Sequence, residues 1–254
     1  MRQRFIQSFS TSGTEQTAID NKELGKPYVA YIEDGQYIDW NTKEALPTDK
    51  LIVTYNVTST TSNVMITNSI MSSAFSAKLE DGTEVPLQNN YTYFRFPDTG
   101  PQKVIFTTNN YTRGRLPSFM SCITISDVFI PDVPEYTYID MSCFEKCVGL
   151  TKINIPDNIT GITNGVNFLY CTGLTEVVIG TNFKAFGNQV FLGCQNLTAV
   201  TINTVVPPTI GNGVLDTNTN AYFYVPDESV SAYKSAESWS VYADRVKGIS
   251  EKPA

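Results

Sequence analysis

One pattern of apolar residues recurs along the second half of the chain, and it constrains the fold more than any other feature. Its clearest copy consists of Phe144, Cys147, Leu150, Ile153 and Ile155. Further copies begin at Phe119, Phe168 and Phe191, so the phenylalanines are spaced by 25, 24 and 23 residues. Self-similarity at this period is the signature of a solenoid. Each copy ends in an alternating apolar pair typical of a short strand, which must stack on its neighbours to bury its apolar side.

The strand part of the pattern continues beyond the copies that keep Phe and Cys. Val104 and Phe106 lie 24 residues before Val128 and Ile130, and Phe223 and Val225 lie 23 residues after Val200 and Ile202. The spacing predicts six rungs from about residue 100 to residue 226, with atypical first and last units that act as caps.

The repeat also resembles a known family. The phrase F-x-x-C-x-x-L-x-x-I-x-I-P keeps its final proline at Pro131 and Pro156, and it resembles the BspA-like leucine-rich repeats of bacterial surface proteins. Residues 224–246 resemble the cap of that family, and residues 53–60, Asp81-Gly82 and residues 91–93 resemble the region before its solenoid. The resemblance implies a scaffold used in adhesion, without shared catalytic residues.

Composition limits the possible partners. Hydrophobic residues make up 41% of the chain and aromatic residues 12%, which is enough for a substantial core, while charged residues make up only 17%. This balance favours an all-β protein with an extracellular type of surface. A net charge of −7 argues against binding to nucleic acid, and no apolar run is long enough for membrane insertion.

Residues 1–24 are polar, and they lack a secretory hydrophobic region and a lipid-acceptor cysteine. We therefore expect either a mature form from which a leader has been removed, or a phage virion protein that lysis releases; the Met at position 1 favours the second. We interpret the segment as an extended arm that docks on a capsid or tail protein. The alternative is a frayed terminus without a function. The candidate anchoring residues are Arg2, Arg4, Phe5, Ile6 and Phe9.

Residues 25–48 predict a hairpin, because Glu33-Asp34-Gly35-Gln36 separates two runs rich in aromatic and β-branched residues. Its aromatic side chains suggest a face on which a glycan could stack, or, as the alternative, simple packing of the hairpin against its neighbour. The candidate glycan-stacking residues are Tyr28, Tyr31, Tyr37 and Trp40.

Residues 51–107 continue the alternation, with turns at Asp81-Gly82 and at residues 97–100. They predict a small antiparallel sandwich that runs directly into the solenoid through Val104–Phe106 and covers its open end. At the other end, we expect a capping helix with Asp227 as its N-cap and Gly248 as its stop. Its buried face should carry Val230, Tyr233, Ala236, Trp239, Tyr242 and Val246, which recur at three- and four-residue spacing.

The cysteines predict neither a disulfide framework nor a metal site. Cys122, Cys147, Cys171 and Cys194 share one repeat position, where stacked side chains point the same way, and we expect them to be buried fillers. Cys143 lies outside the repeat, and a disulfide between Cys143 and Cys147 stays open as an alternative that nothing in the sequence requires. The chain has no histidine, so zinc sites and most acid–base schemes near neutral pH are disfavoured, and we expect no metal and no cofactor. A carboxylate pair for glycoside hydrolysis stays open as an alternative.

Together these features predict a mainly β chain in four parts: an N-terminal arm (1–24), a small antiparallel β domain (25–99), a short leucine-rich-repeat solenoid (100–226), and a capping helix and tail (227–254). The expected function is non-enzymatic adhesion by a phage virion fibre or decoration protein that binds a bacterial surface protein or glycan. The alternatives are an exported BspA-like adhesin on the bacterial cell surface and a glycan-active enzyme. A symmetric homo-oligomer is compatible with a fibre.

Overall fold

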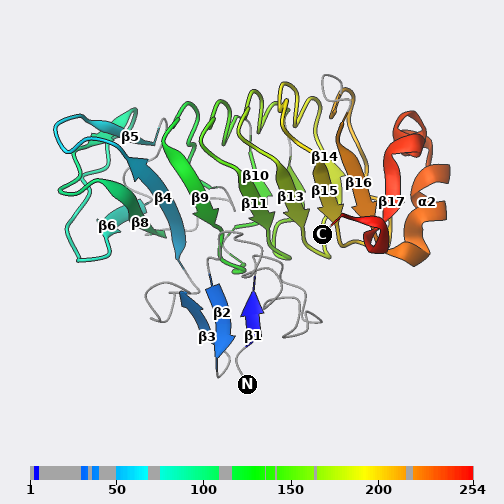
Figure 1. Ribbon diagram of the computed structural model, residues 1–254, viewed down its shortest axis with the longest axis horizontal. Helices are drawn as coiled ribbons and strands as arrows, with labels where there is room; N and C mark the ends of the chain where they lie inside the picture. The colour runs from blue at the N-terminus through cyan, green and yellow to red at the C-terminus, as the bar shows by residue number, and fades with distance from the viewer. Residues whose placement is uncertain are drawn as a thin grey trace.

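A computed structural model describes residues 50–67, 75–108, 116–134, 136–140, 142–162, 165–215 and 220–253. Before them it describes the backbone of three strands, β1 (Gln3–Phe5), β2 (Ala30–Glu33) and β3 (Gln36–Asp39), which form one antiparallel sheet. The pairing of Glu33 with Gln36 confirms the predicted hairpin. The larger part of the chain is a coil of parallel strands with an antiparallel β unit at one end and short helices at the other (Figure 1).

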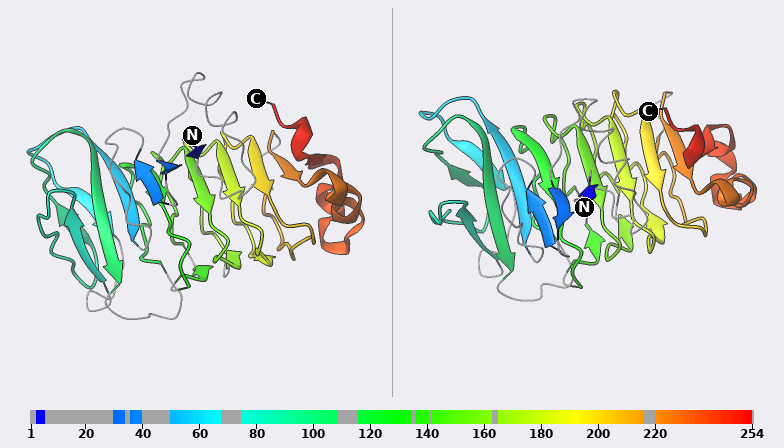
Figure 2. Two further views of the ribbon diagram at one scale, coloured as in Figure 1. Left: turned by 90° about the horizontal axis from the view of Figure 1, so that it is seen from below. Right: turned by 60° about the horizontal axis from the view of Figure 1, so that its bottom comes forward.

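The coil carries two parallel sheets. The main sheet has five strands in the order β11 (Lys152–Ile155), β13 (Glu176–Ile179), β15 (Ala199–Ile202), β16 (Tyr222–Val225) and β17 (Val246–Gly248). A second sheet, which the sequence analysis did not predict, contains β10 (Tyr138–Ile139), β12 (Gly161–Ile162) and β14 (Ala185–Phe186). The turns that contain β11, β13 and β15 therefore contribute one strand to each sheet, and the prediction of a mainly β solenoid is confirmed (Figure 2).

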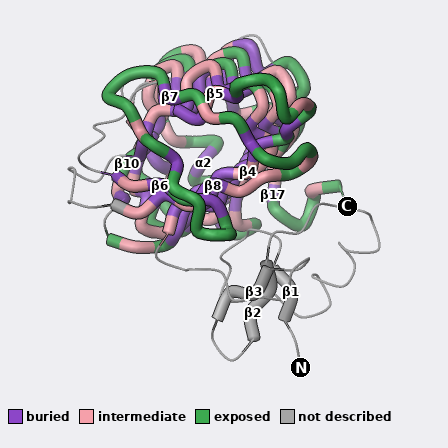
Figure 3. The backbone as a smooth tube through the Cα atoms, turned by 90° about the vertical axis from the view of Figure 1, so that its left-hand side faces the viewer, coloured by how far each residue is buried: buried purple, intermediate pink, exposed green. Residues whose placement is uncertain are grey.

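The predicted row of inward-facing residues is present. Ile153 pairs with Val177, Val177 with Val200, and Val200 with Phe223. The strand β9 (Ile125–Phe129), which carries Val128, lies beside β11 at the start of the row. These side chains are all at least 98% buried, and the exposed parts of the chain lie on the outside of the coil (Figure 3).

The recurrence of Phe and Cys at one position of each copy has a direct physical explanation. Phe119, Phe144, Phe168 and Phe191 stack on one another with ring centroids 5.3–5.6 Å apart. In the last three of the four copies the cysteine donates its thiol hydrogen to the carbonyl oxygen of the phenylalanine one turn earlier, at 3.1 Å for Cys147, 2.9 Å for Cys171 and 3.0 Å for Cys194. All five cysteines are free and buried, which confirms the filler role. The cysteine is therefore both a small filler and a hydrogen-bond donor between turns.

The turns between the two sheets also repeat. The second residue after each repeat phenylalanine has a left-handed backbone: Ser121 at φ 63°, Lys146 at 59°, Tyr170 at 58° and Gly193 at 78°. The N–H groups of Ser121, Lys146 and Tyr170 donate to carbonyl oxygens of the next turn at 2.7–2.9 Å. Since the conformation recurs in every copy, it belongs to the scaffold and is not the mark of a functional residue.

The N-terminal β unit comprises β4 (Leu51–Val57), β5 (Val64–Thr67), β6 (Phe75–Leu79), β7 (Thr92–Phe94) and β8 (Gly100–Thr108). Its two sheets have the orders β6-β8-β4-β9 and β5-β7. Tyr55, Ile66 and Phe96 are buried, and the Tyr55 hydroxyl donates to the Ile66 carbonyl oxygen at 2.6 Å. The turn at Gly82 has φ 88° and lies between the paired residues Lys78 and Glu84, as predicted.

The predicted passage from this unit into the solenoid through β8 is wrong. Strand β4 lies between β8 and β9 and is antiparallel to both, so that Val53 is opposite Val104 on one side and Val128 on the other. Strands β8 and β9 therefore run in the same direction, with Val104 and Val128 at the same level. This explains why their spacing of 24 residues resembles that of stacked rungs. The β unit does close the first edge of the solenoid, as expected, and residues 100–108 belong to that unit.

A C-terminal capping helix is present, as predicted, but it is shorter than expected and the cap is not one continuous helix. The chain forms η1 (Asp227–Ser229), α2 (Val230–Ser235), η2 (Glu237–Arg245), the strand β17 and η3 (Ile249–Glu251). Ala236 has an extended backbone with ψ 131°, which ends α2. Val246 pairs with Phe223 in β17, because the last rung would otherwise have unpaired backbone groups.

The last turn is nevertheless covered as expected. Trp239 is fully buried, lies 4.9 Å from the Phe223 ring and donates its indole N–H to the Pro208 carbonyl oxygen at 2.6 Å. Asp227 is not the N-cap of α2; its carboxylate accepts from the N–H and hydroxyl groups of Ser250 instead. Gly248 is the end of β17 and has φ −69°, so it is not a left-handed helix stop.

We predict that Phe168→Ala strongly destabilises the protein. Its ring lies between those of Phe144 and Phe191, so its removal leaves a cavity in the middle of the stack. A loss of about 3–5 kcal/mol in the free energy of unfolding is expected from urea denaturation. Val148→Ala is the control, since Val148 is 40% exposed on the neighbouring turn and should cost less than about 1 kcal/mol. Equal losses for the two variants would contradict the stacked core.

We predict that the folded protein is nearly inert to a thiol reagent. Burial raises the pKa of the Cys122, Cys143, Cys147 and Cys171 thiols, and the reactive species is the thiolate. Ellman titration should find almost no rapid reaction in buffer and all five thiols in denaturant. Rapid reaction of more than one thiol in buffer would show that the core is open.

Candidate ligand-binding site

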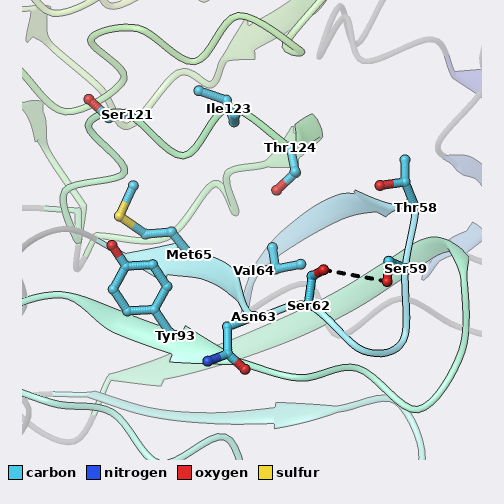
Figure 4. A pocket seen from close by; sticks show the side chains of 10 residues that line it. All are labelled: Thr58, Ser59, Ser62, Asn63, Val64, Met65, Tyr93, Ser121, Ile123 and Thr124. Atoms are coloured by element: carbon cyan, nitrogen blue, oxygen red, sulfur yellow. Dashed lines mark hydrogen bonds between the residues drawn. The ribbon is translucent and has the colours of Figure 1, made fainter.

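A pocket of about 290 Å³ lies where the N-terminal β unit meets the first turn of the solenoid. In Figure 4, Tyr93, Met65 and Val64 lie on one side and Ser121, Ile123 and Thr124 on the other. The remaining lining residues are Thr58, Ser59, Ser62 and Asn63. The two walls come from separate parts of the sequence, and pockets at such junctions are common ligand sites.

The walls are held by backbone pairing on both sides. Strands β5 and β7 pair antiparallel, which places Met65 opposite Tyr93. The opposite wall is the segment before β9, and the Asn56 N–H group donates to the Thr124 carbonyl oxygen at 2.8 Å. In the loop after β4, the Ser59 hydroxyl contacts the Thr61 hydroxyl at 2.9 Å and accepts from Ser62 at 3.4 Å. The pocket is therefore built largely before any ligand arrives.

The lining is uncharged and partly apolar. Hydroxyl groups come from Thr58, Ser59, Ser62, Ser121, Thr124 and Tyr93, and one carboxamide comes from Asn63. Tyr93 is 53% exposed and Ile123 59% exposed. Because the lining residues include no carboxylate, thiol, amine or imidazole, the chemistry that they supply is hydrogen bonding and apolar contact.

The outer face of the five-stranded sheet carries an ion-paired cluster. Glu176 on β13 accepts from Lys152 on β11 at 2.6 Å and from Lys252 of the C-terminal segment. Lys252 also donates to the Thr201 hydroxyl at 3.0 Å. Asn154, Thr201 and Tyr224 point outward from this sheet yet are buried. This face is therefore largely covered, whereas the pocket is open.

The cluster holds the Glu176 carboxyl ionised. Burial opposes ionisation, but Lys252 and Lys152 outweigh it, and the pKa of Glu176 falls from 4.5 to about 2. The ion pair between Lys252 and Glu176 connects residues 76 positions apart in the sequence and fastens the C-terminal segment to the sheet. This is a structural role.

Two aspartates that each follow a proline, Asp132 and Asp157, are also part of the scaffold. Asp132 accepts from the Asn158 N–H group at 2.9 Å, and Asp157 accepts from the Thr181 N–H group at 2.5 Å. Burial, with the nearby Asp157 charge, raises the pKa of Asp132 although the Asn158 bond opposes the shift. Each carboxylate thus joins one turn to the next.

The match to known families agrees with this geometry. A family described as "BspA type Leucine rich repeat region" matches residues 115–235 in six copies. Residues 115–235 are a BspA-type leucine-rich-repeat region. No curated protein matches the chain. The BspA-type region is typical of surface or adhesion-type proteins, which is the coarse function that the match supports.

Most residues predicted from the sequence to form sites lie outside the described residues. Arg2, Ile6, Phe9, Tyr28 and Trp40 are among them. Arg4 and Phe5 are in β1, opposite Tyr31 and Ala30 of β2, so the predicted arm includes a sheet strand there. Tyr37 is in β3, opposite Ile32. The anchoring and glycan-stacking roles of these residues stay predictions.

The pocket between the β unit and the BspA-type region was not predicted from the sequence. The alternation Tyr91-Thr92-Tyr93 gave one signal, because it places both tyrosines on the outer side of a strand whose Thr92 is buried. The second wall could not be found, since it depends on the position of β4 beside β9.

Two further kinds of feature are absent from the part of the chain that the structure describes. No group of three or more metal-binding side chains occurs there. No helix there has the length and hydrophobicity that crossing a membrane requires.

We predict that acid weakens the protein through Glu176. Its depressed pKa contributes stability that is complete above pH about 5 and is lost as the pH falls to about 2, because the unfolded carboxyl has its ordinary pKa. The loss should be on the order of 2 kcal/mol in urea denaturation at a series of pH values.

The variant Glu176→Gln should lose a similar amount at pH 7 and show a flatter pH profile. The control is Glu84→Gln, whose partner Lys78 lies 2.9 Å away in an exposed pair and contributes less than about 1 kcal/mol. An unchanged pH profile in Glu176→Gln would rule out this cluster as the acid-sensitive contact.

Proposed function

We propose that this chain is a non-enzymatic adhesion protein displayed on a surface, with the BspA-type region as its rigid scaffold. We further propose that it is a fibre or decoration protein of a phage virion, that residues 1–24 dock on a capsid or tail protein, and that the opposite partner is a bacterial surface protein or glycan. The observation that carries the proposal is an open, uncharged pocket on a solenoid whose two ends are both closed.

The use of the reactive side chains supports a non-enzymatic role. Glu176 is bound by two lysines, and the Asp132 and Asp157 carboxylates accept backbone N–H groups. The Cys147, Cys171 and Cys194 thiols donate to carbonyl oxygens in the core. These groups stabilise the coil, and a catalytic role would require them to be free to exchange protons or attack a substrate.

The closed ends support display as a rigid element. Strand β4 pairs along β9 at the first edge, and β17 pairs along β16 at the last edge. Exposed strand edges promote association between molecules, and closing them suits a protein that is presented at high local concentration. A symmetric homo-oligomer in a fibre is compatible with this arrangement.

The setting in a virion rests on residues 1–24, which are polar and carry spaced apolar residues suited to docking in a groove. The second candidate is an exported bacterial adhesin at the cell surface, which the BspA-type match favours. A glycan-active enzyme is the third.

The test of anchoring uses purified phage particles and the bacteria that they infect. We predict that the full chain is found in particles by mass spectrometry and that Ile6→Ser/Phe9→Ser lowers its incorporation at least about tenfold, since each buried apolar anchor contributes about 1.5–3 kcal/mol. These positions lie outside β1, so that strand is retained. The matched control is Ser8→Ala.

Other outcomes separate the alternatives. Presence of the chain on washed bacterial cells and its absence from particles would favour the exported adhesin. Turnover of a surface polysaccharide by the purified chain would overturn the non-enzymatic role.

A further inference from the structure

The pocket between the N-terminal β unit and the first turn of the solenoid carries polar side-chain groups that make no hydrogen bond to other described residues. The side-chain hydroxyl or amide groups of Thr58, Asn63, Tyr93, Ser121 and Thr124 line it, and none of them bonds to another described residue. Hydroxyl and carboxamide groups can both donate and accept, so together they can satisfy a ligand that is itself rich in hydroxyl groups.

The absence of charge among the lining residues limits the class of ligand. An anion entering the pocket would lose hydration without meeting a lysine or arginine of the lining, and a cation would meet no carboxylate. The pocket therefore favours a neutral molecule.

The apolar part of the lining has the form that a sugar ring requires. The Tyr93 ring is 53% exposed and Ile123 is 59% exposed, and in Figure 4 they lie on opposite walls. A pyranose has an apolar C–H face that packs on an aromatic ring, and its hydroxyl groups point outward to polar partners. A volume of about 290 Å³ is at the small end of ligand pockets, which suits one or two rings better than a protein surface.

We propose that this pocket binds a neutral saccharide unit, with Tyr93 stacking on the sugar face and Asn63, Thr58, Ser121 and Thr124 binding its hydroxyl groups. The proposal deepens the adhesion function and rests on it, because it names the chemistry that the surface partner would present. The site differs from the aromatic hairpin residues predicted from the sequence.

The two walls of the pocket are also held in fixed positions. Its walls belong to the N-terminal β unit and to the segment before β9, which β4 joins through paired backbone on both sides. The Ser59 and Ser62 hydroxyls are already bonded to each other, which limits the rotamer entropy lost on binding. Both walls must keep their positions for Tyr93 and Ser121 to act on one ligand.

The test measures binding of the full chain to a panel of sugars by saturation-transfer NMR and isothermal titration calorimetry. The panel contains glucose, galactose, mannose, N-acetylglucosamine, N-acetylgalactosamine and their short oligomers, with sialic acid and glucuronic acid as the charged members. We expect at least one neutral member to bind and the charged members to bind at least about tenfold more weakly, since the pocket offers them no counter-charge.

The decisive variant is Tyr93→Ala, which should lower the affinity about tenfold because it removes the stacking ring. Its matched control is Tyr91→Ala, because Tyr91 is equally exposed at 53% but does not line the pocket, and its affinity should be unchanged. Asn63→Ala gives an independent variant on an exposed loop. Thermal melting checks that each variant is folded.

Three results would overturn the assignment: no neutral sugar binds, Tyr93→Ala binds as well as the unchanged chain, or only a protein partner competes for the pocket. A cell-binding assay distinguishes failure of the pocket assignment from failure of the adhesion role. If the chain adheres to cells and Tyr93→Ala adheres equally, adhesion stands and the pocket assignment fails. If the chain binds a neutral sugar and no cell surface, the pocket assignment stands and adhesion fails.

Discussion

Pairing in register between successive turns is the constraint on which the rest of the structure depends. Ile153, Val177, Val200, Phe223 and Val246 lie in one row because each strand pairs with the next without a shift. That register brings the phenylalanine rings into a stack and places the Cys147, Cys171 and Cys194 thiols against carbonyl oxygens of the turn before. The Asp132 and Asp157 carboxylates likewise join one turn to the next, at the outside of the coil. Each turn alone would leave apolar surface and backbone groups exposed, so stability arises between turns.

A stack of this kind has two open edges, and the chain closes them by different means. At the first edge β4 pairs antiparallel with β9, which makes the N-terminal β unit an extension of the coil. At the last edge β17 adds a parallel strand, and Trp239 covers the Phe223 ring. Lys252 then fastens the C-terminal segment to Glu176 on β13, the second strand of the sheet. Closure of the first edge also creates the pocket, since it brings the two-stranded β5–β7 sheet against the first turn.

The parts that could be predicted from the sequence are those that periodicity encodes. The spacing of Phe, Cys and Leu predicted the solenoid, the inward row and the buried cysteines. The periodicity led to a wrong prediction for β8, namely that it is a rung of the solenoid. Val104 of β8 and Val128 of β9 are both opposite Val53 of the intervening antiparallel strand β4, so the two strands have the spacing of stacked rungs without being neighbours. It also led to a wrong prediction from Val230 to Val246, because the helical spacing of apolar residues continues past Ala236, where α2 ends. Val246 pairs with β16 as part of a strand instead. The pocket was not predictable, because its walls meet only through the long-range pairing of β4 with β9.

The pocket therefore depends on the N-terminal β unit and the BspA-type region folding as one body. Amide hydrogen exchange followed by NMR tests this most directly. If the account is correct, the amides of β4 and β9 exchange as slowly as those of β11, β13 and β15, and all of them lose protection at the same denaturant concentration. Fast exchange in β4 and β9, or loss of their protection while the β11–β15 amides remain protected, would show two independent units and would contradict the continuous core and the site built on it.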